Sequence, residues 1–413
     1  MSVVYLCSQK YLSLSIFLSI ISNIPKKNTS ILWLVIVFIA VNSNAQSLNK
    51  DSIFLNENLQ KDLSGRKQNI YAQAKFDYGG IIPTVKEKGI EKYYGLDLRV
   101  AWQKRVNNVY SKLYNSPKFG LGFYSGAFDN NAFGEPNGLY GFVEVPIFDQ
   151  RKKLNWIYSI GAGLAFNFSY YDPIDNPSNE LIGSNRNVYI AFSLEGRYNI
   201  TENWVAGLGF GFKHFSNGRL YLPNRGINLL PLTVTTEYNF GDNYTDIKIG
   251  KVPTFIPFNI VNIYGAAGFK NFEYGKAKYF KSTLSLNFLR QFNYKFRYGL
   301  GAEIFYTAGS LERISNDKSD FNKLFSYGIS AQWEWLITDR LYIPLNFGIH
   351  LNRNVENYEK FLYQRVALRY LLGKQKKLMI GVGLKVTEFR ADYVEWTIGY
   401  VSKNDKNKYD LIF

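Results

Sequence analysis

One short stretch of the sequence combines a base and a hydroxyl at a spacing that could do chemistry. It reads Phe212-Lys213-His214-Phe215-Ser216-Asn217-Gly218 and contains one of the two histidines in 413 residues. Histidine is the usual general base near neutral pH, and serine becomes a good nucleophile only when a base takes its proton. On a β-strand, residues two apart point the same way with Cα atoms about 6.5–7 Å apart, so His214 could reach the Ser216 hydroxyl. The pair predicts a serine hydrolase site.

Polar groups that follow the pair could complete such a site. Asn217 could offer its side-chain amide, and Gly218 its backbone N–H, to a developing oxyanion. The next segment reads Pro223-Asn224-Arg225-Gly226-Ile227-Asn228 and leads into a strand whose even positions are apolar. Asn228 is therefore expected on the same face as His214 and Ser216, where the three side chains would converge.

The residues before the pair predict a strand with one apolar side. Every even position from Trp204 to Phe212 is apolar, so His214 and Ser216 continue an apolar face. The same alternation recurs along the chain, for example over 154–170 and 294–306. A soluble β-sandwich would also alternate. However, the apolar side is rich in Tyr, Trp and Phe towards the strand ends, and the other side carries charge in mid-strand, which is typical of outer-membrane barrels.

The pattern predicts an all-β fold, a transmembrane antiparallel β-barrel of about 14–16 strands. The segments that carry it lie near 70–78, 92–102, 118–127, 138–148, 154–170, 187–200, 203–216, 228–240, 259–270, 277–293, 294–306, 325–337, 340–351, 361–373, 376–388 and 391–402. Such barrels have short periplasmic turns and longer external loops. The tight link Thr201-Glu202 and the long links 172–186 and 217–227 place the His214 end of its strand at the outer rim. The links 103–117 and 241–258 are long on the opposite side and do not fit this rule.

The N-terminal residues predict export. Lys26 and Lys27 precede an apolar run over 31–41, and Ser43-Asn44-Ala45 offers a small-x-small cleavage site, so residues 1–45 are predicted to be a signal peptide. The apolar run is too short for a membrane-spanning helix. Residues 46–69 are predicted to be a polar periplasmic extension and residues 70–413 the barrel, in which the hairpin 203–240 carries the candidate site. We expect the mature chain in the outer membrane of a Gram-negative bacterium.

Composition limits the other classes of function. Lysine and arginine total 49 against 33 acidic residues, a formal net charge of +16. The basic residues are scattered rather than striped, so we expect a surface beside an anionic membrane and no nucleic-acid partner. The one cysteine, Cys7, lies in the predicted signal peptide, which removes thiol chemistry from the mature chain. The two histidines are far apart in strand order, and the glycine-rich stretch 207–211 opens no helix, so we expect no metal and no cofactor.

The candidate motif resembles the signature of the PagL family of lipid A deacylases, acyloxyacyl hydrolase-like barrels of the outer membrane. That signature is His-x-Ser-Asn, a short loop with Pro-Asn-x-Gly-Ile, and then a glutamate. Here His214, Ser216, Asn217 and the run from Pro223 to Ile227 match it at the right spacing. The resemblance implies lipid A, or lipopolysaccharide in the outer leaflet, as the substrate. It also implies hydrolysis of an ester-linked acyl chain from the membrane-facing side.

The sequence departs from this family pattern at one position, because Asn228 stands where the glutamate is expected. Asparagine can hold an imidazole tautomer, although changing aspartate to asparagine in a serine triad costs about four orders of magnitude in rate. Three possibilities remain open: Asn228 orients His214, a carboxylate of the neighbouring loop does so, or the site is altered or inactive. The candidate carboxylates of that loop are Asp172, Asp175 and Glu180.

The loop between the two strands also carries candidate substrate-binding residues. They are Arg219, Asn224 and Arg225. Arginine pairs well with phosphate, so Arg219 and Arg225 could bind the phosphates of lipid A, although solvated loop charge is an equally good interpretation. The other histidine, His350, has no serine two residues away and is expected to be a residue of the barrel rim.

The sequence thus predicts an outer-membrane serine esterase that removes an acyl chain from lipid A. His214 would be the base, Ser216 the nucleophile, Asn217 with the Gly218 N–H the oxyanion stabiliser, and Asn228 the orienting residue. The alternative is a channel or structural barrel that keeps the hairpin without turnover, because about sixteen strands in one barrel would enclose an aqueous lumen. The sequence leaves open whether the chain forms a homodimer.

Overall fold

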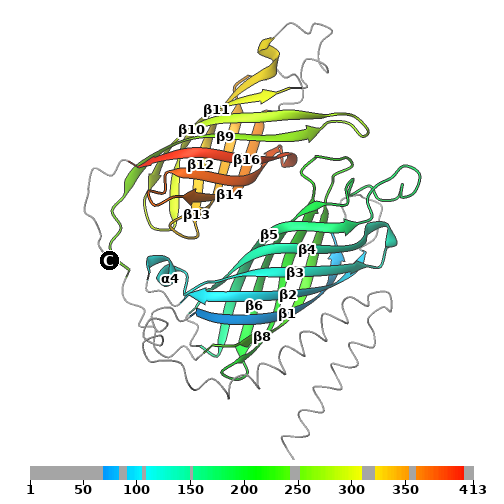
Figure 1. Cartoon of the computed structure of the whole chain (residues 1–413), viewed down its shortest axis with the longest axis vertical. Helices are drawn as coiled ribbons and strands as arrows, with labels where there is room; N and C mark the ends of the chain where they lie inside the picture. The colour runs from blue at the N-terminus through cyan, green and yellow to red at the C-terminus, as the bar shows by residue number, and fades with distance from the viewer. Residues whose placement is uncertain are drawn as a thin grey trace, which may run out of the picture. The chain divides into compact units, whose positions relative to one another are not determined.

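Antiparallel strands make up most of the structure, a computed structural model (Figure 1). It describes residues 68–82, 91–104, 108–148, 152–241, 252–308, 321–352 and 360–403. The predicted signal peptide, 1–45, and nearly all of the predicted extension, 46–69, lie outside these ranges. Within the described ranges, no helix is both long and apolar enough to cross a membrane.

The strands form two closed barrels of eight strands each. The first contains β1 (Gln68–Ile81), β2 (Lys92–Lys104), β3 (Lys118–Phe128), β4 (Gly134–Pro146), β5 (Leu154–Phe168), β6 (Asn187–Asn199), β7 (Trp204–Ser216) and β8 (Ile227–Asn239). The second contains β9 (Phe258–Asn271), β10 (Lys278–Gln291), β11 (Phe296–Thr307), β12 (Phe325–Leu336), β13 (Leu341–His350), β14 (Leu362–Leu372), β15 (Leu378–Thr387) and β16 (Arg390–Lys403). Within the described ranges, three short helical segments lie in the links: α4 (Val109–Leu113), η2 (Asn131–Phe133) and η3 (Phe321–Leu324).

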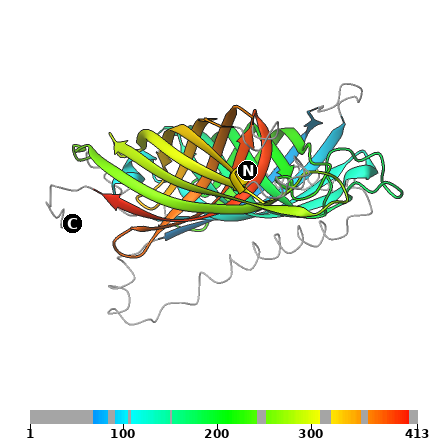
Figure 2. The same ribbon diagram turned by 90° about the horizontal axis from the view of Figure 1, so that it is seen from above.

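The prediction of an all-β antiparallel barrel is confirmed, but the expected single barrel of 14–16 strands is not what forms. Strand β8 pairs back with β1, for example Tyr238 opposite Ala72, and closes the first barrel. Strand β16 pairs with β9, for example Tyr400 opposite Ile263, and closes the second. In both views the strands of each barrel lie side by side as a tilted, closed sheet (Figures 1 and 2).

The division into two barrels accounts for one of the links that did not fit the rule for loop lengths. Strand β8 ends the first barrel at Asn239 and β9 begins the second at Phe258, so the link 241–258 joins two barrels; its residues 242–251 lie outside the described ranges. It is a connection between barrels and need not be a tight periplasmic turn. The other exception, 103–117, contains the helix α4.

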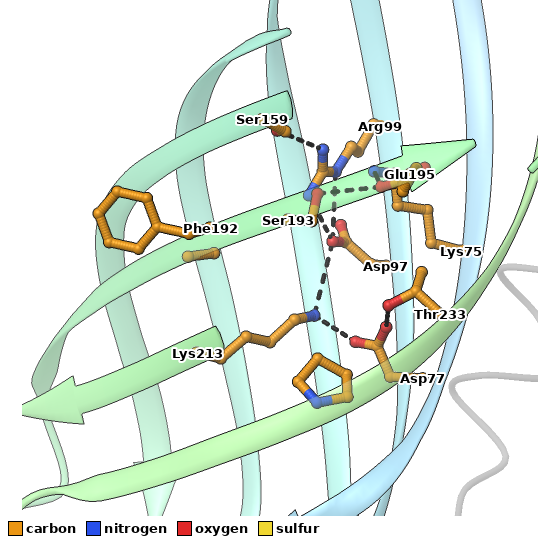
Figure 3. Close-up of a pocket in the computed structure, with 12 residues that line it drawn as sticks. Lys75, Asp77, Asp97, Arg99, Ser159, Phe192, Ser193, Glu195, Lys213 and Thr233 are labelled. Atoms are coloured by element: carbon orange, nitrogen blue, oxygen red, sulfur yellow. Dashed lines mark hydrogen bonds and ion pairs between the residues drawn. The ribbon is translucent and has the colours of Figure 1, made fainter. Parts of the chain in front are cut away.

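Paired charges occupy the interior of the first barrel. Arg197 lies 2.6 Å from Glu144 and 3.0 Å from Glu237. Figure 3 shows another such pair, Lys213 with Asp77. In the part of this barrel that the structure describes, the buried charged residues balance, five basic against five acidic: Lys75, Arg99, Lys118, Arg197, Lys213, Asp77, Asp97, Glu144, Glu195 and Glu237. An eight-stranded barrel is just wide enough for side chains to fill it, so these charges are desolvated and must be paired.

The outer face of the first barrel is apolar along the strands that carry the candidate site. Leu208 and Phe210 on β7 are 58% and 60% exposed, and Leu230 and Leu232 on β8 are 53% and 55% exposed. Lys213 on β7 and Leu229 on β8 stand at positions that point the other way, and both are buried in the interior. This arrangement, apolar outside and polar inside, is the one that a lipid bilayer requires of a spanning barrel.

Candidate active site

The candidate site lies at one end of the β7–β8 hairpin, on the outer face of the first barrel. His214 and Asn228 are directly opposite each other across the two strands. The residues between the chemically active ones point inwards: Lys213 pairs with Asp77, and Phe215 is wholly buried against Tyr189, with ring centroids 5.1 Å apart. His214 and Ser216 therefore face outwards, on the same side as the exposed residues of β7.

The imidazole of His214 bridges the serine and the asparagine. Its Nε2 lies 2.8 Å from Ser216 Oγ, and its Nδ1 lies 2.6 Å from Asn228 Oδ1. Asn228 Oδ1 can only accept, so in this arrangement Nδ1 carries the proton and Nε2 presents its lone pair to the serine hydroxyl. This is the tautomer that a general base for Ser216 needs.

The loop between the strands holds Asn217 and Asn224 against each other. The backbone N–H of Asn217 donates to Asn224 Oδ1 over 3.0 Å. The side-chain Nδ2 of Asn217, predicted to stabilise an oxyanion, donates instead to Ser184 Oγ over 2.9 Å, and Asn217 is 4% exposed. Asn224 accepts through its oxygen, which leaves its Nδ2 hydrogens for another acceptor.

Two glycines of the loop have backbone conformations that favour glycine. Gly218 has φ +60° and Gly226 has φ +78°. Gly226 is also pressed against the base, because a Cβ at this position would lie 2.8 Å from His214 Cε1. The glycine of the Pro-Asn-x-Gly-Ile run thus serves both the turn and the space beside the imidazole.

Two of the three candidate loop carboxylates, Asp172 and Glu180, have partners other than the base. The Asp172 side chain accepts from the backbone N–H groups of Ile174 and Asp175, over 2.8 and 3.0 Å. The bonds from Asp175 and Ile174 lower the pKa of the Asp172 carboxyl. Glu180 lies 3.7 Å from Arg225, and both side chains are about half exposed. Among the described residues, Asn228 is the side chain that hydrogen-bonds His214 Nδ1, and no carboxylate does so.

The candidate substrate-binding residues surround the base and the hydroxyl. Arg219, Asn224 and Arg225 line the same open cavity as His214 and Ser216. His350, by contrast, lies at the end of β13 in the second barrel, 2% exposed, with Nδ1 2.6 Å from the carbonyl oxygen of Lys360. In the described part of the chain, no group of three or more His, Cys, Asp or Glu side chains is arranged to hold a metal ion.

Sequence reasoning missed residues of the link between β5 and β6. Ser184 holds the Asn217 amide, and the carbonyl of Leu181 accepts from the backbone N–H groups of Arg225 and Gly226, each over 3.0 Å. These residues lie about 30–45 positions before the ones they contact and carry no periodic pattern, so nothing in the sequence pointed to them.

Two family models match the chain, one over each barrel. Residues 96–237 match lipid A 3-O-deacylase (PagL), and residues 259–404 match the C-terminal domain of acyloxyacyl hydrolase. The first match contains all the residues of the candidate site. A comparison with curated protein sequences finds no match.

Solved structures with some similarity are outer-membrane barrels. Neisserial surface protein A is 13% identical, with a TM-score of 0.27, over 41% of this chain and 96% of its own. The P. putida toluene transporter TodX is 9% identical, with a TM-score of 0.16, over 83% and 90%. A variant of the Rh. blastica porin is 5% identical, with a TM-score of 0.16, over 81% and 100%. Scores this low add nothing to the fold, which the strand pairing already defines.

The two family matches together cover more than half of the sequence; one covers β9 to β16, and the other covers the first barrel from within β2 to within β8. The chain belongs to the PagL family of lipid A deacylases, ester-bond hydrolases of the Gram-negative outer membrane.

Proposed function

We propose that this chain is a serine esterase that removes an ester-linked acyl chain from lipid A in the outer leaflet, with Ser216 as nucleophile and His214 as base. The observation that carries the proposal is the outward-facing relay in which His214 lies 2.8 Å from Ser216 Oγ and 2.6 Å from Asn228 Oδ1. A substrate that diffuses within the leaflet reaches such a site without passing through a pore. The name of the matching family model points to the 3-O-linked chain.

The reaction would follow the two-step course of serine esterases. His214 Nε2 takes the proton of Ser216 Oγ as the oxygen attacks the ester carbonyl, and the tetrahedral intermediate carries the negative charge on the former carbonyl oxygen. The intermediate then collapses, the sugar hydroxyl leaves with the proton from His214, and the acyl group stays on Ser216. Water, deprotonated by His214, releases the fatty acid and restores the serine.

The oxyanion needs donors, and the loop supplies two. We assign this role to the backbone N–H of Gly218 and to the side-chain Nδ2 of Asn224. Asn217, the residue expected from the sequence, gives its amide to Ser184 and its backbone N–H to Asn224 Oδ1. Asn217 would thus orient Asn224, since the accepting oxygen fixes which end of the Asn224 amide is turned towards a ligand. Arg219 and Arg225, which line the cavity, would bind the phosphates of lipid A.

The channel alternative receives no support from the first barrel. Its interior is occupied by balanced ion pairs, and eight strands do not enclose a water-filled passage. Whether the protein forms a homodimer stays open.

Mass spectrometry of lipid A tests the proposal. Cells that express the chain should contain lipid A that has lost one ester-linked acyl chain, and cells that express Ser216→Ala should not. Ser402→Ala, an exposed serine at the end of β16, is the matched control and should behave like the unaltered chain. Identical acylation with the unaltered chain and with Ser216→Ala would overturn the proposal. Conductance in planar bilayers that persists in Ser216→Ala would favour the channel instead.

A further inference from the structure

The loop that carries the oxyanion donors is held by a second loop, the strip Leu181–Ser184 between β5 and β6. Ile182 forms an isolated antiparallel bridge with Asn224. The carbonyl of Leu181 accepts from the N–H groups of Arg225 and Gly226. The two loops approach so closely that a Cβ on Gly183 would lie 2.5 Å from the carbonyl of Leu222. The position of Asn224 is thus set by the position of this strip.

The Leu181 and Ile182 end of the strip is in turn held by the side chain of Asn179. Its Oδ1 accepts from the backbone N–H groups of Leu181 and Ile182, over 3.1 and 3.2 Å. Its Nδ2 donates to the carbonyls of Ala132 in η2, over 3.0 Å, and of Ser169 at the end of β5, over 2.5 Å. Asn179 is 0% exposed. A primary amide has two donor hydrogens and two accepting lone pairs, and here each of the four is used.

We propose that Asn179 is a positioning residue for catalysis, which acts through the strip Leu181–Ser184 to hold Asn224 where an oxyanion develops. The proposal rests on the esterase function above. Asn179 touches neither the base nor the nucleophile; its effect passes through two backbone N–H groups, the bridge between Ile182 and Asn224, and the Leu181 carbonyl. The base and the nucleophile stand on β7, which the barrel itself fixes, so the contacts of Asn179 act first on the loop that carries the oxyanion donors.

This chain of contacts predicts a specific kinetic defect. Asn179→Ala removes the bonds to the buried N–H groups of Leu181 and Ile182 and to the carbonyl of Ser169, so the strip shifts and Asn224 loses its place. The carbonyl of Ala132 keeps its bond from Asn176. Removing an oxyanion donor outright costs about 10²–10³ in kcat, so displacing one should lower kcat by about tenfold to a hundredfold. KM should change by less than about threefold, because the long Arg219 and Arg225 side chains still reach a phosphate after a small shift of the loop and the apolar face is unchanged.

A matched control lies three residues earlier in the same loop. Asn176 also donates to the carbonyl of Ala132, over 2.9 Å, and to that of Tyr170, over 3.0 Å. Its Oδ1 accepts from Ser178 Oγ and not from the strip. Asn176→Ala should therefore keep kcat within about threefold of the unaltered chain, whereas a general loss of loop packing would affect both variants alike.

A double-mutant cycle with Asn224→Ala separates positioning from a merely structural role. If Asn179 acts through Asn224, the variant that carries both changes should be no slower than Asn224→Ala alone. The full-length protein would be assayed on lipopolysaccharide in detergent, with kcat and KM measured separately and folding checked by urea titration. Where Asn179→Ala does not fold, Gly183→Ala is used, because it pushes the strip away from Leu222 and should lower kcat with the same small effect on KM.

Two results would overturn the proposal. One is activity of Asn179→Ala equal to that of Asn176→Ala; the other is losses in Asn179→Ala and Asn224→Ala that simply multiply. Failure of the esterase function looks different, because Ser216→Ala would then still release fatty acid. An inactive Ser216→Ala together with an unaffected Asn179→Ala would remove the positioning role alone.

Discussion

The asparagine at position 228 gives the sharpest test of how this site works. His214 Nδ1 lies 2.6 Å from Asn228 Oδ1, so the amide already holds the proton on the correct nitrogen. What the amide lacks is a negative charge to stabilise the imidazolium that forms when Ser216 gives up its proton. Asn228→Asp adds that charge with almost no change of shape, and Asn228→Ala removes the acceptor.

The size of both effects follows from the kind of hydrogen bond. A bond between neutral groups contributes about 0.5–1.5 kcal/mol and one to a charged group about 1.5–3 kcal/mol, a difference of about 1–1.5 kcal/mol. That difference corresponds to about tenfold in rate, so Asn228→Asp should raise kcat by about tenfold. Asn228→Ala frees the tautomer as well as removing the bond and should lower kcat by about tenfold to a hundredfold.

The assay is the release of fatty acid from lipopolysaccharide by the purified protein, measured by mass spectrometry over time. Leu230→Ala, on the same outward face of β8 and 53% exposed, is the control and should leave kcat unchanged. A gain near four orders of magnitude in Asn228→Asp would show that the amide mostly donates to His214, contrary to the tautomer inferred above. No loss in Asn228→Ala would refute the role of Asn228 altogether.

Two further predictions concern the glycine beside the base and the charges inside the barrel. Gly226→Ala should lower kcat by about a hundredfold, because its Cβ would meet His214 Cε1 and a displacement of about 1 Å can cost that much. Gly275→Ala, with φ +75° but nothing within 4 Å, should leave kcat unchanged in the same assay, and equal losses would contradict the contact. Glu144→Ala, which leaves Arg197 buried without its closest partner, should destabilise the protein by about 3–5 kcal/mol in urea titrations. Glu180→Ala, which removes a half-exposed partner of Arg225, should cost less than about 1 kcal/mol, and similar costs would argue against a desolvated interior.

The strands were predictable from the sequence because their two faces meet opposite environments. On β7, Leu208 and Phe210 face outwards while Lys213 lies in a polar interior, and this contrast imposes a period of two. The predicted ranges 203–216 and 228–240 differ from β7 and β8 by a single residue at each shifted end.

The closure of the sheet was not predictable in the same way. A strand shows the same alternation whether its neighbour is the next strand or the first one, so β8 could pair with β9 or return to β1. Two features of the sequence were consistent with two barrels, but alternation alone gave no way to judge them. One was the long link 241–258 on the side where short turns were expected. The other was the presence of charges of both signs on the inward faces of the strands. In a wide barrel those charges would be solvated, whereas eight strands force Arg197 and Glu144 into contact.

The residues of the candidate site also divide into those that the sequence could place and those that it could not. His214, Ser216 and Asn228 stand on paired strands, so alternation and the shared hairpin were enough to expect them on one face. Asn217 and Ser184 stand in loops. A loop has no regular alternation of side chains, so the position of a residue in the sequence does not tell where its side chain points. The contact between them depends on how the β5–β6 loop packs against the β7–β8 loop, which the sequence does not show.

Alternation on β7 also explains why a site on the outside of a barrel can be rigid. Lys213 is tied to Asp77, and Phe215 packs against Phe168, with ring centroids 5.3 Å apart. Each inward residue is fixed by the packed interior, so the outward residues on either side, His214 and Ser216, keep their spacing although lipid on that face offers no fixed contacts. The loop donors have no such support from the barrel, because their backbone leaves the sheet after Ser216. A site built in this way needs a separate clamp for its loop, and the fully buried amide of Asn179 is placed to provide it.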